Sequence, residues 1–140
     1  MKEIYSPDRI AEMIMTIDPD FYLPSDEQRP IISIDTNPLE PAVVIAGAGS
    51  GKTETMAARV VYLVANQFAR PDQILGLTFT RKAAGELNTR IRKRLRQFQQ
   101  AQDKAGIERT FSSLETAVTT YHSYAGRLLS EHAIRYGIDA

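Results

Sequence analysis

Residues 42–53, AVVIAGAGSGKT, decide how this 140-residue chain folds. The stretch opens with the apolar run 42–46, and a short wholly apolar run is typical of a strand covered on both faces of a parallel sheet. Three glycines follow, although glycine loses more backbone freedom on folding than any other residue. Residues 52–68, KTETMAARVVYLVANQF, then have the pattern of a helix that is apolar almost all round. We therefore predict a strand, a glycine-rich turn and a helix in immediate succession.

Such a turn is suited to binding phosphate. Glycines let backbone N–H groups point at an anion with no Cβ in the way, and the positive end of the following helix adds to the attraction. Lys52 is placed to reach the outer phosphates, and the Thr53 hydroxyl to ligate Mg²⁺. The pattern G-x-x-x-x-G-K-[ST] has Ala46 at its first position here, and alanine is small enough for the loop to close. A glycine-rich turn with a surface lysine is the alternative, and the flanking strand and helix favour phosphate binding.

The rest of the chain continues the alternation of strands and helices. Residues 7–17 are spaced as a short amphipathic helix, and Ser25 is a candidate cap for a turn or short helix after it. Three strands, each followed by a helix, are typical of a parallel sheet with crossover helices, so the predicted fold class is α/β. The further elements are expected at 73–80 (strand), 81–100 (helix), 116–121 (strand) and 123–137 (helix).

Composition excludes some chemistry and leaves the partners open. The chain has no cysteine, which excludes disulfides, thiolate metal sites and a cysteine nucleophile. No segment approaches membrane-spanning length, so we expect a cytoplasmic protein without a membrane partner. Lys plus Arg and Asp plus Glu both number 17, but the first forty residues are acidic and the region 81–96 is basic. These basic residues face either a polyanion or solvent, and for most of Arg90, Arg92, Lys93 and Arg94 we favour solvent.

Three further segments bear on what is bound. The amide of Gln28 matches the donor and acceptor edge of adenine, although a lone glutamine usually lies at the surface. Phe79 follows a strand and either stacks on a base or belongs to the core. Tyr121 and His122 follow the next strand, where a histidine commonly serves only a helix-start hydrogen bond. Ligands of open α/β sheets bind at such strand ends.

Taken together, four segments resemble the start of UvrD/Rep-type superfamily 1 DNA helicases. SDEQRPII (25–32), VIAGAGSGKTETMAARVVYLV (44–64), ILGLTFTRKAAGELNTRI (74–91) and TTYHSYAGRLL (119–129) look, in order, like the Q motif and motifs I, Ia and Ib of the first RecA-like domain. The sequences TETMAARVVYLVAN (53–66) and LTFTRKAA (77–84) look especially like those of the UvrD-like helicase–nuclease proteins of actinobacteria. On this resemblance residues 1–24 are a helical lead-in, and 25–140 are part of a RecA-like, P-loop NTPase domain with an incomplete parallel sheet and flanking helices.

The resemblance implies ATP and Mg²⁺ as cofactors and single-stranded DNA as partner. Lys52 and Thr53 would be catalytic, Lys52 on the β- and γ-phosphates and Thr53 on the metal. The other nucleotide-binding positions would be Gln28, Arg29, Ala46, Gly47, Ala48, Gly49, Ser50, Gly51 and Glu54. The DNA contacts would be Thr78, Phe79, Thr80, Arg81, Tyr121 and His122. Arg81 stands where asparagine is frequent in motif Ia, and Tyr121 where phenylalanine is frequent in motif Ib.

The resemblance also implies parts that the sequence does not contain. Residues 124–140 hold no apolar strand ending in Asp-Glu, so the acidic Walker B segment is missing, as are the second RecA-like domain and its arginine finger. We expect the opening part of a motor for DNA repair that moves 3′ to 5′ on single-stranded DNA and unwinds duplex, without activity of its own. The parent would have further domains, and a helicase–nuclease partner subunit is a candidate.

The implied sheet order has a consequence for the isolated chain. In that order the Walker B strand and its neighbour lie between the strands of motifs I and Ia. Without them we expect exposed apolar faces and strand edges, and a marginal fold that self-associates, swaps elements or pairs its strands differently.

Two other functions stay open from the sequence. One is a different P-loop phosphotransferase, such as a small-molecule kinase, although no arginine-rich lid insertion is seen. The other is a non-catalytic nucleic-acid-binding module that uses helix 81–96, whose DNA binding would depend steeply on salt and survive Lys52→Ala.

Overall fold

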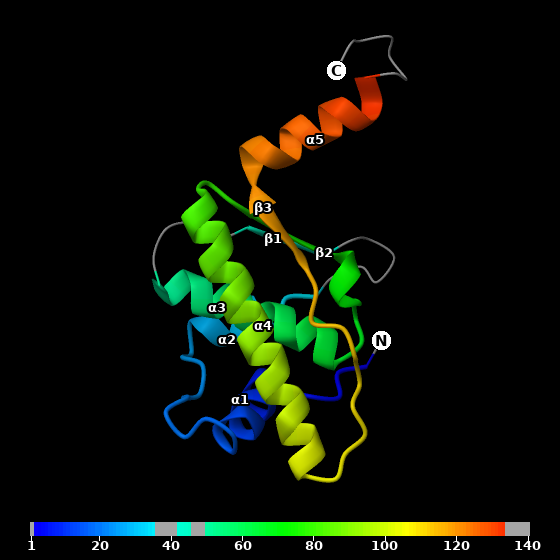
Figure 1. Cartoon of the computed structure of the whole chain (residues 1–140). Coiled ribbons are helices and arrows are strands. Elements are labelled where there is room, and N and C mark those ends of the chain that lie inside the picture. Colours follow the sequence, from blue (N-terminus) through cyan, green and yellow to red (C-terminus); the bar gives the residue numbers. More distant parts are fainter. Residues whose placement is uncertain (1, 36–41, 46–49, 134–140) are drawn as a thin grey trace.

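The structure, a computed structural model, describes residues 2–35, 42–45 and 50–133, without the side chains of 42–45, 50, 132 and 133. Its elements alternate as predicted (Figure 1). In chain order they are α1 (Pro7–Met15), α2 (Gln28–Ile32), β1 (Ala42–Ile45), α3 (Ser50–Ala65), the 3-10 turn η1 (Pro71–Gln73), β2 (Ile74–Thr78), α4 (Arg81–Lys104), β3 (Ala117–Thr120) and α5 (Tyr121–Ala133).

The three strands form one parallel sheet in the order β1-β2-β3. Ile45 lies beside Leu77 in the first pair, and Thr78 beside Thr120 in the second. All three strands therefore end at the same edge of the sheet, where α3, α4 and α5 begin. The expected family order places two strands between β1 and β2, whereas here these strands are direct neighbours.

The hydrophobic core lies between α1, α3 and α4. Its largest fully buried side chains include Ile14 of α1, Leu63 of α3, and Leu87, Leu95 and Phe98 of α4. The apolar spacing in 81–100 predicted this face of α4. Phe98 makes an edge-on contact with Tyr5, with ring centroids 5.2 Å apart. The N-terminal helix α1 therefore packs in the same core as α3 and α4.

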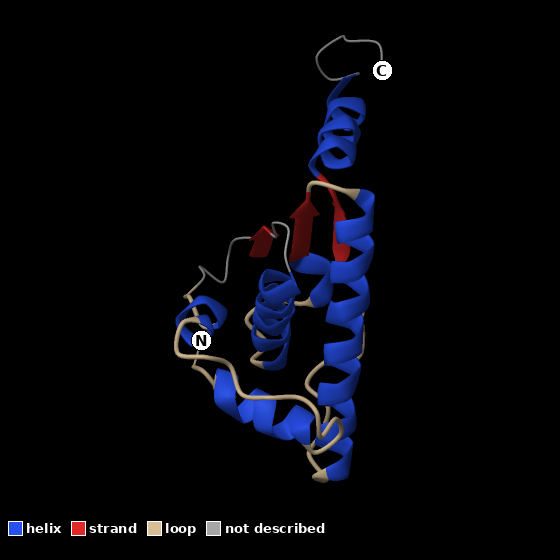
Figure 2. Ribbon diagram, turned by 90° about the vertical axis from the view of Figure 1, so that its left-hand side faces the viewer, coloured by secondary structure: helices blue, strands red, loops and turns tan. Residues whose placement is uncertain are grey.

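Helix α4 runs the length of the helical body, while α5 extends away from it beyond β3 (Figures 1 and 2). Most side chains of α5 are exposed, Leu129 to 62%. None of the helices in the described ranges is both long and apolar enough to cross a membrane.

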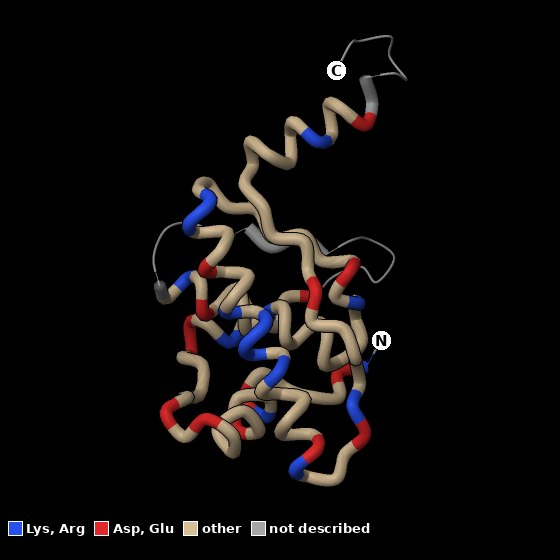
Figure 3. Tube along the Cα trace, viewed as in Figure 1, with Lys and Arg blue, Asp and Glu red and all other residues tan. Residues whose placement is uncertain are grey.

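Charge is segregated along the chain, with acidic positions gathered on the N-terminal segment and basic ones on α4 (Figure 3). The interpretation that most of the basic residues at 90–94 are simply solvated needs correction, because Lys93 is exposed and the Arg90 and Arg92 side chains are 41% exposed, yet all three arginines also pair with carboxylates. Arg94 is only 8% exposed and pairs with Glu54 and Asp18. Arg90 also pairs with Glu54, and Arg92 with Glu115. The carboxylates that pair with these arginines lie 23 to 76 positions away in the sequence. The local run of basic residues therefore could not indicate that the fold would supply partners for them.

Candidate nucleotide and DNA site

The predicted phosphate loop lies at the start of α3. Ala46, Gly47, Ala48 and Gly49 lie outside the described residues, and Ser50 is the first residue of the helix. Gly51 and Lys52 are exposed, and Thr53 is half-buried. A Cβ built on Gly51 would meet no atom of the described residues within 4 Å. The Lys52 side chain thus stands at the positive end of a 16-residue helix, the position that the phosphate-binding prediction requires.

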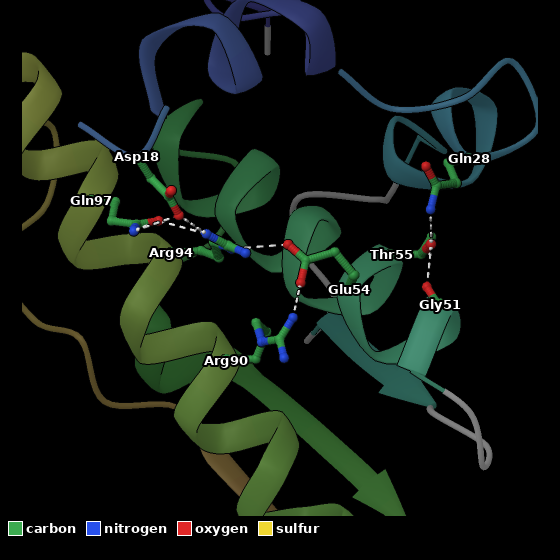
Figure 4. A network of polar contacts seen from close by, with 8 residues as sticks. All are labelled: Asp18, Gln28, Gly51, Glu54, Thr55, Arg90, Arg94 and Gln97. Carbon is green, nitrogen blue, oxygen red and sulfur yellow. Dashed lines mark hydrogen bonds and ion pairs between the residues drawn. The ribbon is translucent and has the colours of Figure 1, made fainter. Parts of the chain in front are cut away.

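Gln28 connects α2 to α3. Its Oε1 accepts a hydrogen bond from Ser25 N–H at 2.9 Å, and Ser25 Oγ accepts one from Gln28 N–H at 3.1 Å, which confirms Ser25 as a cap. The Gln28 Nε2 donates to Thr55 Oγ1 at 3.0 Å, and Thr55 Oγ1 donates to the Gly51 carbonyl (Figure 4). A primary amide has two donors and two acceptor lone pairs, so one of each is left for a ligand. The predicted contact with adenine stays a prediction that this geometry accommodates.

Arg29 is occupied by contacts within the N-terminal region. It binds Asp8 of α1 and Asp26, both at 2.8 Å, and the Pro24 carbonyl. The hydrogen bonds that Arg29 donates to Asp8 and Asp26 raise the pKa of its guanidinium. Arg29 therefore ties α2 to α1, and its predicted nucleotide contact stays untested.

Glu54, just after the first turn of α3, points toward α4 (Figure 4). One carboxylate oxygen accepts from Arg94 Nε at 2.9 Å, and the other is paired with Arg90. Its exposed fraction is 8%. Glu54 thus fixes the N-terminal part of α3 against α4, and any contact with nucleotide comes in addition to that task.

A cavity of about 40 Å³ lies between α1, α2, α3 and α4. Its walls are mostly apolar, and Gln28, Glu54, Thr55 and Arg94 contribute its polar groups. Tyr22, which is 61% exposed, also lines it. The cavity is therefore bounded by the predicted adenine-binding glutamine on α2 and by the first turns of the phosphate-binding helix α3.

Of the residues at the end of β2 and just after it, some make structural hydrogen bonds and others are exposed. Thr78 is 1% exposed, and its hydroxyl donates to the Thr80 carbonyl at 3.1 Å. The Thr80 hydroxyl accepts from Ala83 N–H at 3.0 Å and so caps α4. Phe79 between them is 73% exposed, which settles that it is not a core residue, and Arg81 is exposed as well. The DNA contacts predicted for these residues stay predictions, and the buried Thr78 side chain is the least accessible of them.

The residues after β3 repeat this arrangement. Thr120 is buried, and its hydroxyl accepts from Ser123 N–H at 3.1 Å, which starts α5 two residues earlier than predicted. Tyr121 is half-buried and His122 exposed. The rings of Phe79 and Tyr121 lie 5.0 Å apart between centroids, tilted by 39°. Two aromatic residues from separate motifs therefore form one pair at the end of the sheet.

Comparison with known proteins decides the family. The family model described as the UvrD/REP helicase N-terminal domain matches residues 25–140. The chain belongs to this family. Its α/β architecture with a parallel sheet agrees with an incomplete RecA-like domain, as the resemblance implied.

Among individual relatives, DNA helicase IV of Escherichia coli is 46% identical over 74 residues, covering 44% of this chain and 11% of that protein. The ATP-dependent DNA helicase UvrD1 of Mycobacterium leprae is 35% identical over 97 residues, covering 69% of this chain and 11% of that protein. The ATP-dependent DNA helicase PcrA of Staphylococcus aureus is 34% identical over 99 residues, covering 71% of this chain and 12% of that protein. The chain thus spans little more than a tenth of the length of these relatives.

Sequence reasoning missed the residues that link these sites. Thr55 and Arg94 were not among the predicted site residues, yet both line the cavity and bind predicted ones. The one available signal was the S-x-x-Q spacing of Ser25 and Gln28, which is that of a capping box and predicts that the Gln28 amide is held locally. Nothing in the sequence predicted the partners of Arg94.

Proposed function

We propose that the chain is the nucleotide-binding and single-strand-binding part of an ATP-dependent DNA helicase. The observation that carries this proposal is the shared edge of the sheet. Lys52 and Thr53 follow β1, and the aromatic pair of exposed Phe79 and half-buried Tyr121 follows β2 and β3 at the same edge. In open α/β sheets ligands bind outside the carboxyl ends of the strands. A nucleotide and a DNA strand bound there lie close enough to act on one another through α3 and α4.

ATP and Mg²⁺ fit the residues at this edge. The N-terminus of α3 offers backbone N–H groups and Lys52 to the phosphates. Mg²⁺ takes few protein ligands besides phosphate oxygens and water, so one hydroxyl, that of Thr53, suffices from this part of the chain. The base lies across the opening of the cavity, between Gln28 and Tyr22, because about 40 Å³ is too small to enclose a ring system. In the parent protein ATP hydrolysis would drive movement along DNA, with the hydrolytic carboxylates supplied from elsewhere.

Single-stranded DNA fits the aromatic pair. Stacking on an aromatic side chain contributes about 1–3 kcal/mol per base and tolerates any sequence. Phe79 and Tyr121 offer neighbouring rings, and Arg81 and the N-terminus of α4 lie beside them for a phosphate.

The test is binding of a fluorescent oligo-dT by the chain and by Phe79→Ala. We expect Phe79→Ala to weaken binding about five- to 150-fold, the equivalent of one stacked base. Phe68→Ala is unsuitable as a control because Phe68 packs on the core, so Ile4→Ala, which removes an exposed apolar side chain outside both proposed sites, is the control. Equal binding by the chain and Phe79→Ala would refute the DNA site.

The runner-up function is a nucleic-acid-binding module that uses the basic residues of α4. The structure disfavours it in one respect, since Arg90, Arg92 and Arg94 are already paired with carboxylates. Lys93 and Arg96 stay exposed on the outer face of α4. If this module were the function, Lys93→Ala with Arg96→Ala would weaken oligo-dT binding more than Phe79→Ala does.

A further inference from the structure

Arg94 lines the cavity whose opening we assign to the nucleotide base, and it contacts residues that line this cavity or lie beside it. Its Nε donates to Glu54 Oε1 on α3 at 2.9 Å. Its Nη1 donates to Asp18 Oδ2 at 3.2 Å and to Gln97 Oε1 at 2.8 Å. Its guanidinium carbon lies 4.3 Å from the centroid of the Phe21 ring. Figure 4 shows this side chain reaching across from α4 to the polar groups on either side.

These contacts span walls that are distant in sequence. Glu54 lies just after the first turn of α3, directly after Thr53. Asp18 and Phe21 belong to the segment that leads from α1 to Tyr22 and Pro24, which also line the cavity. Arg94 therefore fixes the position of the segment between α1 and α2, which forms one cavity wall, relative to the start of α3. Any ligand that touches both walls depends on that spacing.

An arginine is suited to this position and a lysine is not. The planar guanidinium donates in several fixed directions and stacks on an aromatic face at the same time, whereas an ammonium is a compact point charge. The Arg94 side chain is 10% exposed, and the Glu54 side chain 11%. A pair buried to this extent holds its geometry only while each charge stays matched, so its loss leaves the partners to rearrange.

We propose that Arg94 is a positioning residue for nucleotide binding, which holds the base-binding walls in register with the phosphate-binding turn of α3. This inference rests on the proposed function, because it assumes that the cavity opening receives the base. It predicts that loss of Arg94 weakens recognition of the base more than recognition of the phosphates, because Glu54 keeps its pair with Arg90, which still ties the start of α3 to α4.

The experiment measures two ligands on the 140-residue chain. A fluorescent ATP analogue is titrated in the presence of Mg²⁺, and inorganic triphosphate, which has no base, is then used as competitor. The variants are Arg94→Met, which keeps the volume and removes the charge, and Arg94→Lys, which keeps the charge and removes the fork. Arg92→Met is the matched control, because Arg92 lies on the same helix and pairs with the exposed Glu115.

We expect Arg94→Met to weaken the ATP analogue about tenfold and to change triphosphate less than about twofold, in line with the loss of a residue that orients a ligand-binding group. Arg94→Lys is expected in between, and Arg92→Met unchanged. A merely structural role would shift both ligands together. Circular dichroism checks folding, and if Arg94→Met is unfolded, Arg94→Lys carries the test with an expected loss of about threefold for the ATP analogue alone.

The outcomes separate the two proposals. Equal weakening of both ligands, or no change in either, overturns the positioning role and leaves the nucleotide site standing. If the unaltered chain binds neither ligand, or binds both equally well after Lys52→Ala, the proposed function fails and the role of Arg94 fails with it.

Discussion

At the scale of single residues, Asn66 shows how a polar side chain fixes the N-terminus. It is 2% exposed, and its Oδ1 accepts from the backbone N–H groups of Ile4 and Tyr5, both at 2.7 Å. Its Nδ2 donates to the carbonyls of Tyr5 and Tyr62, both at 2.9 Å. An asparagine after a helix reads as an end signal, and nothing in the sequence predicts partners more than sixty positions away.

Replacing Asn66 by alanine leaves these backbone groups without partners in a buried place. We expect Asn66→Ala to lower the free energy of unfolding by about 2–4 kcal/mol, because each buried unsatisfied group costs about 1–3 kcal/mol. Urea denaturation measures it. Asn88→Ala, on the outer face of α4, is the control and should change stability by less than about 0.5 kcal/mol. Similar stabilities for the two variants would show that water replaces the Asn66 contacts.

Asp18 makes stability depend on pH. Burial, the largest influence, would raise the pKa of its carboxyl, but the hydrogen bonds from Gln97 and Arg94 outweigh it and leave the pKa below the ordinary value of 3.8. A carboxyl with a lowered pKa stabilises the fold above its ordinary pKa, and this contribution is lost as the pH falls through the lowered value.

We therefore expect Asp18→Asn to be less stable than the unaltered chain at pH about 7, with the difference shrinking below pH about 4. Urea denaturation at several pH values measures it, with Asp20→Asn as the exposed neighbouring control. A difference that is constant with pH would mean that the charge of Asp18 contributes nothing.

At the scale of elements, apolar runs and apolar periodicity predicted the three strands and helices α1, α3, α4 and α5, whereas α2 was left open as a turn or short helix and η1 was not predicted. The ends were less predictable, because side chains that cap a helix decide them. The Thr120 hydroxyl caps α5, which begins at Tyr121. Helix α3 ends at Ala65, three residues earlier than predicted, and Gln67 just beyond it has a φ of 61°. Helix α4 continues to Lys104, beyond the apolar pattern, and Gly106 with a φ of 70° follows its end.

Thr80 is both the cap of α4 and a predicted DNA contact, and two substitutions separate these roles. We expect Thr80→Ala to destabilise the chain by about 1 kcal/mol through loss of the bond to Ala83 N–H, and Thr80→Ser to be nearly neutral because serine caps equally well. Thermal unfolding measures both. If Thr80→Ser weakens oligo-dT binding while stability is kept, the methyl group contacts DNA; equal loss of stability in both variants would contradict the capping role.

Gly85 lies inside α4 with open space around its Cα. A Cβ there meets nothing within 4 Å, so we expect Gly85→Ala to stabilise the chain by about 0.5–1 kcal/mol through the better helix propensity of alanine. Gly106→Ala is the contrasting variant and should destabilise, because its φ of 70° strains any residue with a Cβ. Denaturation midpoints measure both, and a destabilising Gly85→Ala would show that the exposed face of α4 is covered.

At the scale of the whole molecule, the motifs were predictable from sequence and their connections were not. The phosphate-loop lysine, the glutamine and the two aromatic residues were all singled out by type and spacing, and their roles stay predictions. The contacts that join their surroundings run between residues such as Glu54 and Arg94, 40 positions apart, which no local pattern encodes. The direct pairing of β1 with β2 is of the same kind, because register between distant strands follows from the complete sheet.

The central claim is that one edge of this sheet binds both a nucleotide and single-stranded DNA. The measurement that tests it most directly is titration of a fluorescent ATP analogue with Mg²⁺ on the chain and on Lys52→Ala, each with and without oligo-dT. We predict saturable binding by the chain, at least about tenfold weaker in Lys52→Ala, and an affinity that changes when oligo-dT is present. Binding that is equal in the two proteins, or absent from both, would contradict the claim.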